Sequence, residues 1–324
     1  MSEDEGLDQD FAPDERIFHY TSAEGLYGIL RSGCLWATHF QFLNDSREFY
    51  AARESLINFV KGEVHKQLAA WKVNGEFDFE SGVDLRAIAE HEVTVIVDSM
   101  YETTYGRLGD PFVFSGFCCT PDHPSYEGGG LLHWATYGQR GGYALRLNPH
   151  KIFRLLKQEH KKFPSSSYQS GKVVYSTGVP PKSLSEKYEV IAKVARCMIE
   201  GLVRNDMSRV NVFESASPFW RISSMLKDAY FRDEEEARVV FMRMRDLIPD
   251  TAGQPIEMRH SDGVSVPYIE MFKGALLGDD CPIEAILIGP HAERARRLRA
   301  LTTYLHSVSL SSIEVIESDV PYVG

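Results

Sequence analysis

Short runs of strand-like sequence are separated by long helical stretches, and this order constrains the fold more than any other feature of the chain. Helical spacing of apolar residues marks 22–30, 46–72, 85–101, 131–137, 184–203, 220–230 and 292–306. Strand-like runs occur at 16–20, 35–38, 112–119, 142–147, 172–175, 237–242, 256–260, 266–272, 283–288 and 313–318. A regular α/β fold would alternate strand and helix. The pattern therefore predicts an α+β fold with a mixed or antiparallel β core and helical insertions.

The domain organisation follows from the same pass along the chain. Residues 1–15 are acidic and lack apolar periodicity, so we predict a disordered acidic tail. The helical stretches within about 46–105 form a predicted helical insertion. No segment resembles a linker, and a length of 324 residues fits one elaborated domain or two. We interpret residues 16–324 as a single elaborated α+β domain.

Charge and cysteine content exclude several classes of protein. The formal net charge of −11 disfavours binding to bare nucleic acid, because the phosphate backbone would be repelled overall, although a local basic groove stays open. Five cysteines without a C-x-x-C spacing do not indicate a disulfide framework or a zinc site. No apolar run approaches the length of a membrane span. We therefore expect a reduced, cytoplasmic protein without a membrane partner.

The first candidate for chemistry is the segment Phe18–Ser22, where a short strand leads into a helix. His19 and Thr21 point to the same face of a strand, and the helix that starts at Ser22 offers unpaired N–H groups. This arrangement suits a ribose hydroxyl together with a phosphate or an amide. The alternative is a buried strand histidine followed by a Ser/Thr helix cap, since short motifs of this kind often occur without function.

Two further segments place polar or aromatic groups beside helix starts. In the segment Asn44–Glu48, Asn44 or Asp45 would cap a helix, with Glu48 as the capping-box partner. The same polar side chains would equally serve as ligand anchors at the mouth of a pocket. The glycines at 128–130 would let the backbone approach a ligand or form a mobile flap. Trp134 and Tyr137 share one helix face, where they would stack a planar ring, although core packing explains Trp134 as well.

The densest set of charges lies between Lys227 and Arg238. If a strand starts near Glu234, then Glu234, Glu236 and Arg238 lie on one of its faces. Burying such charges is costly unless they are paired. The pattern therefore favours a functional role over a simple ion pair at a sheet edge. A Glu-x-Glu pair near Lys227 suits stabilisation of a cationic transition state or binding of a metal.

Taken in order, these segments resemble a family of bacterial proteins called domain of unknown function 2971. The resemblance spans about residues 16–305, and the family name itself implies no activity. The segments that carry the resemblance are His19–Ser22, Leu26–Leu30, Leu35-Trp36, Asn44–Glu48, Leu131–Tyr137, Glu234–Arg238 and Ile286–Pro290.

The opening of the chain is also similar to that of DNA- and RNA-modifying ADP-ribosyltransferases. This weaker resemblance implies an ADP-ribosyltransferase-like β core, NAD as the substrate, no metal, and an acceptor that is protein, nucleic acid or water. It also implies a role in bacterial defence or as a toxin. The Ser-Thr-Ser strand of those enzymes has only Phe114-Ser115-Gly116 as a counterpart. The residues implied in catalysis are Glu236, Glu234 and His19, and those implied in NAD binding are His19, Thr21, Ser22, Asn44, Tyr126, Tyr137 and Arg238.

Two other functions fit the same residues. The Glu-x-Glu pair, Lys227 and the carboxylates of the segment Asn44–Glu48 would suit a nuclease or phosphohydrolase that uses a divalent metal. The acidic surface would suit a non-catalytic module that binds a regulatory protein partner. For the NAD enzyme we predict that His19, Thr21 and Glu236 line one cleft.

Overall fold

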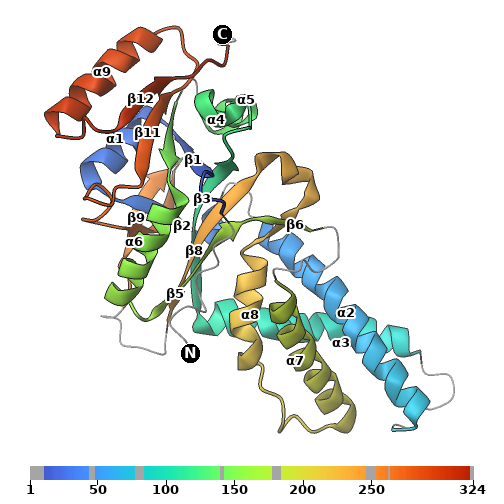
Figure 1. Cartoon of the computed structure of the whole chain (residues 1–324). Coiled ribbons are helices and arrows are strands. Elements are labelled where there is room, and N and C mark those ends of the chain that lie inside the picture. Colours follow the sequence, from blue (N-terminus) through green and yellow to red (C-terminus); the bar gives the residue numbers. More distant parts are fainter. Residues whose placement is uncertain are drawn as a thin grey trace.

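The computed structural model of the protein describes residues 11–43, 48–76, 84–138, 142–176, 184–245, 253–261 and 263–321. A large, mainly antiparallel sheet lies at the centre, with helices on both of its faces (Figure 1). This arrangement confirms the predicted mixed α+β class. Among the described residues, no helix is both long enough and apolar enough to span a membrane.

The sheet contains most of the strands, and a short parallel pair lies beside it. The main-sheet strands are β1 (Arg16–Thr21), β2 (Leu35–His39), β3 (Gly109–Cys119), β4 (Tyr143–Leu147), β5 (Ser166–Lys172), β8 (Glu236–Met244), β9 (Ile256–Ser261), β10 (Val264–Met271), β11 (Ile283–Ile288) and β12 (Glu314–Glu317). The separate pair consists of β6 (Val174–Ser176) and β7 (Leu226–Asp228).

The main sheet branches at β3. Phe117 of β3 is the Cα partner of both Phe18 in β1 and Glu236 in β8, so β1 and β8 lie on opposite edges of β3. Val113 lies nearer the start of β3, and it is the Cα partner of both Thr38 in β2 and Val240 in β8. The strands β1 and β2 therefore share one edge of β3 and continue into two separate arms. These arms are β1-β4-β11-β12 and β2-β10-β9.

The helices form three groups around the sheet, as Figure 1 shows. One face of the sheet packs against α1 (Ala23–Ser32), α6 (Pro149–Lys162) and α9 (Arg294–Ser307). We call it the α1 face. The opposite face packs against α5 (Leu131–Tyr137), which follows the short α4 (Ser125–Gly128), and against a bundle of α2 (Glu48–Asn74), α3 (Leu85–Tyr101), α7 (Ser185–Arg204) and α8 (Phe213–Ser223). We call it the bundle face.

The apolar spacing of the chain explains why these helices form and which sides they bury. In α2, Leu56, Val60, Val64 and Leu68 recur every four residues, and all are fully buried in the bundle core. This spacing places them on one side of a helix. After α3, the chain continues through one stretch of π-helix, η2 (Glu102–Leu108), into β3. The short 3₁₀ segments are η1 (Phe40–Phe42) and η4 (Ala229–Glu234).

The structure differs from the sequence-based expectations of secondary structure at four points. The predicted helix over 220–230 is wrong, because α8 ends at Ser223 and β7 pairs in parallel with β6 from Leu226 onward. The predicted strand over 172–175 is divided at Val173, between β5 and β6. The sequence analysis missed α6, although Asn148 caps it by accepting a hydrogen bond from the Lys151 N–H. Bundle helices α7 and α8 also lie outside the predicted insertion at about 46–105.

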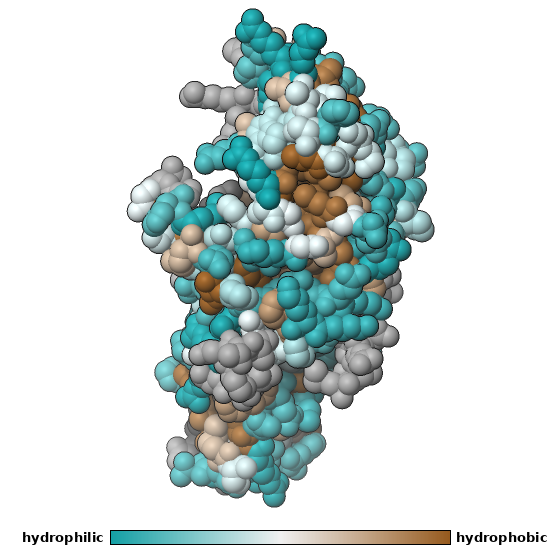
Figure 2. All heavy atoms as spheres, turned by 90° about the vertical axis from the view of Figure 1, so that its left-hand side faces the viewer, coloured by the Kyte–Doolittle hydropathy of each residue, from teal (hydrophilic) through white to brown (hydrophobic). Residues whose placement is uncertain are grey.

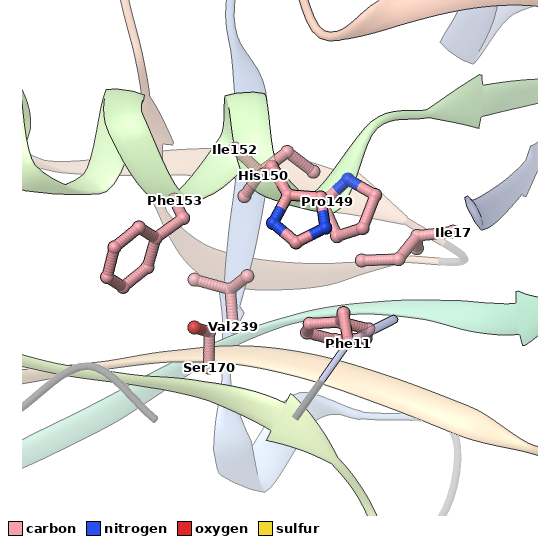
Figure 3. A pocket seen from close by; sticks show the side chains of 8 residues that line it. All are labelled: Phe11, Ile17, Pro149, His150, Ile152, Phe153, Ser170 and Val239. Atoms are coloured by element: carbon pink, nitrogen blue, oxygen red, sulfur yellow. The ribbon is translucent and has the colours of Figure 1, made fainter. Parts of the chain in front are cut away.

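The predicted disordered tail is too long at its C-terminal end. Glu15 is buried, its Oε2 accepts a 2.7 Å hydrogen bond from the Ala12 N–H, and its Oε1 forms an ion pair with Lys172. Phe11 packs on the core and lines a pocket between α6 and the sheet, shown in Figure 3. The cavity volume of about 10 Å³ matches a single water molecule, so this pocket has no room for a nucleotide.

The outer surface over the left-hand side of Figure 1 is mostly hydrophilic. Figure 2 shows this side, where hydrophobic residues form one larger brown area above the middle of the visible surface and smaller areas below it. Apolar patches of limited size are common on soluble proteins. The charged residues between Lys227 and Arg238 do not belong to the hydrophobic areas, because β8 turns Glu236 toward the bundle face.

Candidate functional site

A chain of paired charges lies on the bundle face between α5 and the helical bundle. Lys227 Nζ donates hydrogen bonds to Glu234 Oε2 at 2.6 Å and to Glu236 Oε2 at 2.9 Å. Arg238 binds the same Glu236 carboxylate with two nitrogens, at 2.7 and 2.8 Å. Arg238 also donates to the Ser224 carbonyl oxygen at 3.1 Å. We call Lys227, Glu234, Glu236 and Arg238 the charge network.

The charge network is mostly removed from solvent. The side chains of Lys227 and Glu236 are each 5% exposed and that of Arg238 is 1% exposed, whereas Glu234 keeps 13%. Burial alone would raise the pKa of Glu236. The charge and hydrogen bonds of Arg238, followed by those of Lys227, outweigh burial and hold the pKa of Glu236 below its ordinary value. Glu236 is therefore a fixed carboxylate, and Glu234 has the most exposed side chain of the network.

The local fold brings these residues together from three elements. Lys227 is in β7, Glu234 ends η4, and Glu236 starts β8. Glu235 between the two glutamates has a φ of 46°, a left-handed conformation that ends η4. The strand starts at Glu236, so Glu234 lies just before it, yet Glu234 still reaches the same lysine as Glu236. The Tyr175 hydroxyl secures the strand start by accepting a 2.8 Å hydrogen bond from the Glu236 N–H.

Aromatic side chains of α5 cover the exposed end of the network. The Tyr137 hydroxyl donates a hydrogen bond to Glu234 Oε1 at 3.0 Å, and His133 Nε2 lies 3.1 Å from the Glu234 carbonyl oxygen. Burial and then the charge of Glu234 raise the pKa of Tyr137, so its hydroxyl stays protonated as a donor. Burial also lowers the pKa of His133. Tyr20 stacks on the His133 ring with the ring centres 5.4 Å apart.

The glycine-rich turn before α5 is closely packed. The Gly130 N–H donates to the Tyr20 hydroxyl at 2.9 Å, and Trp134 Nε1 donates to the Gly128 carbonyl at 2.9 Å. Gly129 has a φ of 80°, and a Cβ there would lie 2.6 Å from Trp134 Nε1. These glycines therefore let the backbone approach core aromatic rings in this structure, and the predicted ligand-stacking role fits Tyr137 better than the buried Trp134.

The network coincides with the part of the chain that comparison with known proteins recognises. Residues 133–239 match the family described as Protein of unknown function (DUF2971). We call this range the DUF2971 segment. It supports the predicted resemblance to that family over these residues, and it contains the whole charge network together with His133 and Tyr137. No curated protein and no solved structure matches the chain.

The predicted residues near the N-terminus lie outside the DUF2971 segment and on the other face of the sheet. Phe18, Phe117 and Glu236 are consecutive Cα partners across β1, β3 and β8, so their side chains share the bundle face. Side chains alternate along a strand, which turns His19 and Thr21 to the α1 face. The prediction that His19, Thr21 and Glu236 line one cleft is therefore wrong.

His19 has a structural environment of its own. Its Nδ1 lies 3.0 Å from the Ser115 carbonyl oxygen, at the place where β1 separates from β3, and its ring packs on Phe114 with the centres 4.8 Å apart. Burial lowers the pKa of His19, with the Ser115 hydrogen bond acting in the opposite direction. His19 is thus a partly buried strand histidine with structural contacts, close to the alternative that the sequence offered to a ligand-binding role.

Ser22 caps α1, which agrees with the helix cap that the sequence analysis gave as the alternative to a ligand-binding role. Its hydroxyl oxygen accepts a 3.1 Å hydrogen bond from the Gly25 N–H. We predict that Ser22→Ala lowers the free energy of unfolding by about 1 kcal/mol, because one N–H at the helix start loses its partner. Urea denaturation would measure this loss. Ser22→Asp restores a capping acceptor and should keep the wild-type stability, and equal losses in both variants would contradict the capping role.

The remaining predicted residues divide between the bundle face and the undescribed part of the chain. Tyr126 packs edge-on against Phe18, with the Arg146 guanidinium 5.6 Å from its ring centre. It therefore shares the bundle face with the charge network but contacts a different cation. Asn44 lies outside the described residues. Tyr20, Tyr175 and His133 were not predicted as site residues, although strand alternation from Phe18 could have placed Tyr20 on the face opposite His19.

Proposed function

We propose that the protein cleaves the bond between nicotinamide and ribose in NAD, with Glu234 as the carboxylate that meets the developing positive charge. The supporting observation is the pairing of one partly exposed carboxylate with the Tyr137 hydroxyl at 3.0 Å and with Lys227 at 2.6 Å. A preorganised carboxylate next to a reacting sugar is a strong electrostatic lever for this chemistry. The glutamates of the Glu-x-Glu motif thus take unequal roles.

In the proposed reaction, nicotinamide leaves with the electron pair of the glycosidic bond, and the ribose carbon becomes cationic. Glu234 stabilises that cation, while the Tyr137 ring offers a flat surface for nicotinamide. A nucleophile then forms the new bond to the ribose carbon and releases its proton to the solvent. Glu236 holds Lys227 and Arg238 in place, so it acts as a positioning residue and not by contact with the substrate.

We propose that the ADP-ribose group passes to an acceptor that is a protein, a nucleic acid or water. Protein, nucleic acid or water would each supply a nucleophile, and transfer to a macromolecule would suit a role in bacterial defence or as a toxin. Water as the acceptor would make the protein an NAD glycohydrolase.

The geometry gives less support to the metal-dependent alternative. The Lys227 ammonium group lies between Glu234 and Glu236 and donates a hydrogen bond to each of them. A divalent cation bound between the two carboxylates would have to displace this positive charge. Within the described residues, no group of three or more His, Cys, Asp or Glu side chains is arranged to hold a metal ion.

The proposal is tested by incubating the purified protein with NAD labelled in the nicotinamide ring. We predict release of free nicotinamide at the same rate with and without EDTA, because the proposed site uses no metal. Protein, single-stranded nucleic acid and buffer alone are supplied as acceptors in parallel reactions. An absence of nicotinamide release in all three would contradict the proposal, and phosphate release that requires Mg²⁺ would favour the phosphohydrolase instead.

A further inference from the structure

The edge strand β9 ends one arm of the main sheet, and neither a proline nor a bulge interrupts its described residues. Among the described residues, β9 pairs with β10 alone. Natural edge strands commonly carry a lysine, a proline or a bulge that prevents further pairing. The sequence of β9 is Ile-Glu-Met-Arg-His-Ser, with none of these, and Ile256 and Met258 are 43% and 55% exposed.

The register of the β9–β10 hairpin determines which backbone groups point to the open edge. Ser261 and Val264 are partners across a connection of two residues, which makes them a hydrogen-bonded pair. Hydrogen-bonded pairs alternate along an antiparallel ladder, so Arg259 and Glu257 also bond to β10. The N–H and C=O groups of Ile256, Met258 and His260 therefore point away from β10.

We propose that β9 pairs antiparallel with β9 of a second copy of this chain, about a twofold axis at Met258. In this register the two Met258 residues face each other, and Ile256 faces the partner's His260. On the bundle face of the sheet, Glu257 lies opposite the partner's Arg259, and the same pair recurs on the other side of the axis. The edge is thus complementary in charge to itself, as a symmetric interface requires.

Glu257 and Arg259 form no ion pair with another described residue of their own chain, so both charges are available to a second copy. Glu257 is exposed, and no ion pair joins it to another described residue. Arg259 Nη2 donates a long hydrogen bond of 3.3 Å to Thr38 Oγ1, while its Nε is buried without a hydrogen-bond partner among the described atoms. A carboxylate supplied from the edge would pair with the positive charge of this guanidinium.

Charge-swap variants test both the interface and its register. Sedimentation velocity of the full chain should show a dimer that dissociates on dilution. Arg259→Glu places two pairs of glutamates opposite each other, and Glu257→Arg places two pairs of arginines opposite each other. We expect each variant to weaken dimerisation roughly tenfold or more, because opposite charges across neighbouring strands are replaced by like charges.

Two rescue experiments separate this interface from a general loss of folding. The double variant Glu257→Arg/Arg259→Glu restores opposite charges and should dimerise like the wild type. An equimolar mixture of the two single variants should form heterodimers, since each then meets its complement. A monomeric wild type at roughly 100 μM, or a dimer that the single variants leave intact, would overturn the proposal. Neither result bears on NAD cleavage, which is a separate proposal.

Discussion

Arg238→Met is expected to lower the free energy of unfolding by roughly 3–5 kcal/mol. The substitution keeps much of the aliphatic volume but removes the guanidinium that holds Glu236 with two hydrogen bonds. The Glu236 carboxylate would then be buried with Lys227 as its remaining charged partner in the network. Urea denaturation followed by circular dichroism would measure the change.

Arg232→Met is the matched control for this substitution. Arg232 is an exposed arginine of η4, only a few residues from the network. Exposed substitutions of this kind usually change stability by about 0.5 kcal/mol or less. A loss below about 1 kcal/mol in Arg238→Met would mean that the buried carboxylate finds other partners easily, and it would contradict the central place of Arg238 in the network.

Glu234→Gln is expected to lower kcat for nicotinamide release at least roughly hundredfold, while the Kd for NAD changes little. The amide keeps the shape of the side chain and still accepts the Tyr137 hydrogen bond, but it carries no charge to stabilise the ribosyl cation. Single-turnover kinetics would separate the chemical step from binding.

The neighbouring glutamate provides the control for this variant. Glu235→Gln makes the same chemical change one residue along, in a side chain that is exposed and outside the charge network. We expect it to keep the wild-type kcat. A similar loss in both variants would indicate a general effect on the turn before β8. Unchanged kcat in Glu234→Gln would remove Glu234 from the proposed chemistry.

Much of the fold could be predicted from local sequence patterns, because periodicity reports which side of an element is buried. The apolar spacing within 46–72 predicted α2, and the apolar run over 237–242 predicted β8. The helix α6 was missed although Ile152, Leu155 and Leu156 have helical spacing, so that signal was present and was not used. By contrast, β7 owes its strand conformation to pairing with β6, which local sequence does not reveal.

The candidate site was predicted in part, and the missing information was strand register. The Glu-x-Glu motif and Tyr137 do meet, because Glu234 bonds both Tyr137 and Lys227. His19 was placed with them on the strength of a resemblance, but the pairing of Phe18 with Phe117 turns it away. A shift of one residue in register exchanges the two faces of a strand, and a single sequence does not specify that register.

A crystal structure of the Glu234→Gln variant with NAD would test the central claim most directly, since the slowed variant should retain the intact dinucleotide. We predict density for nicotinamide against the Tyr137 ring, with the ribose next to residue 234 on the bundle face. NAD bound instead on the α1 face beside His19 and Thr21, or no bound NAD at saturating concentration, would contradict it.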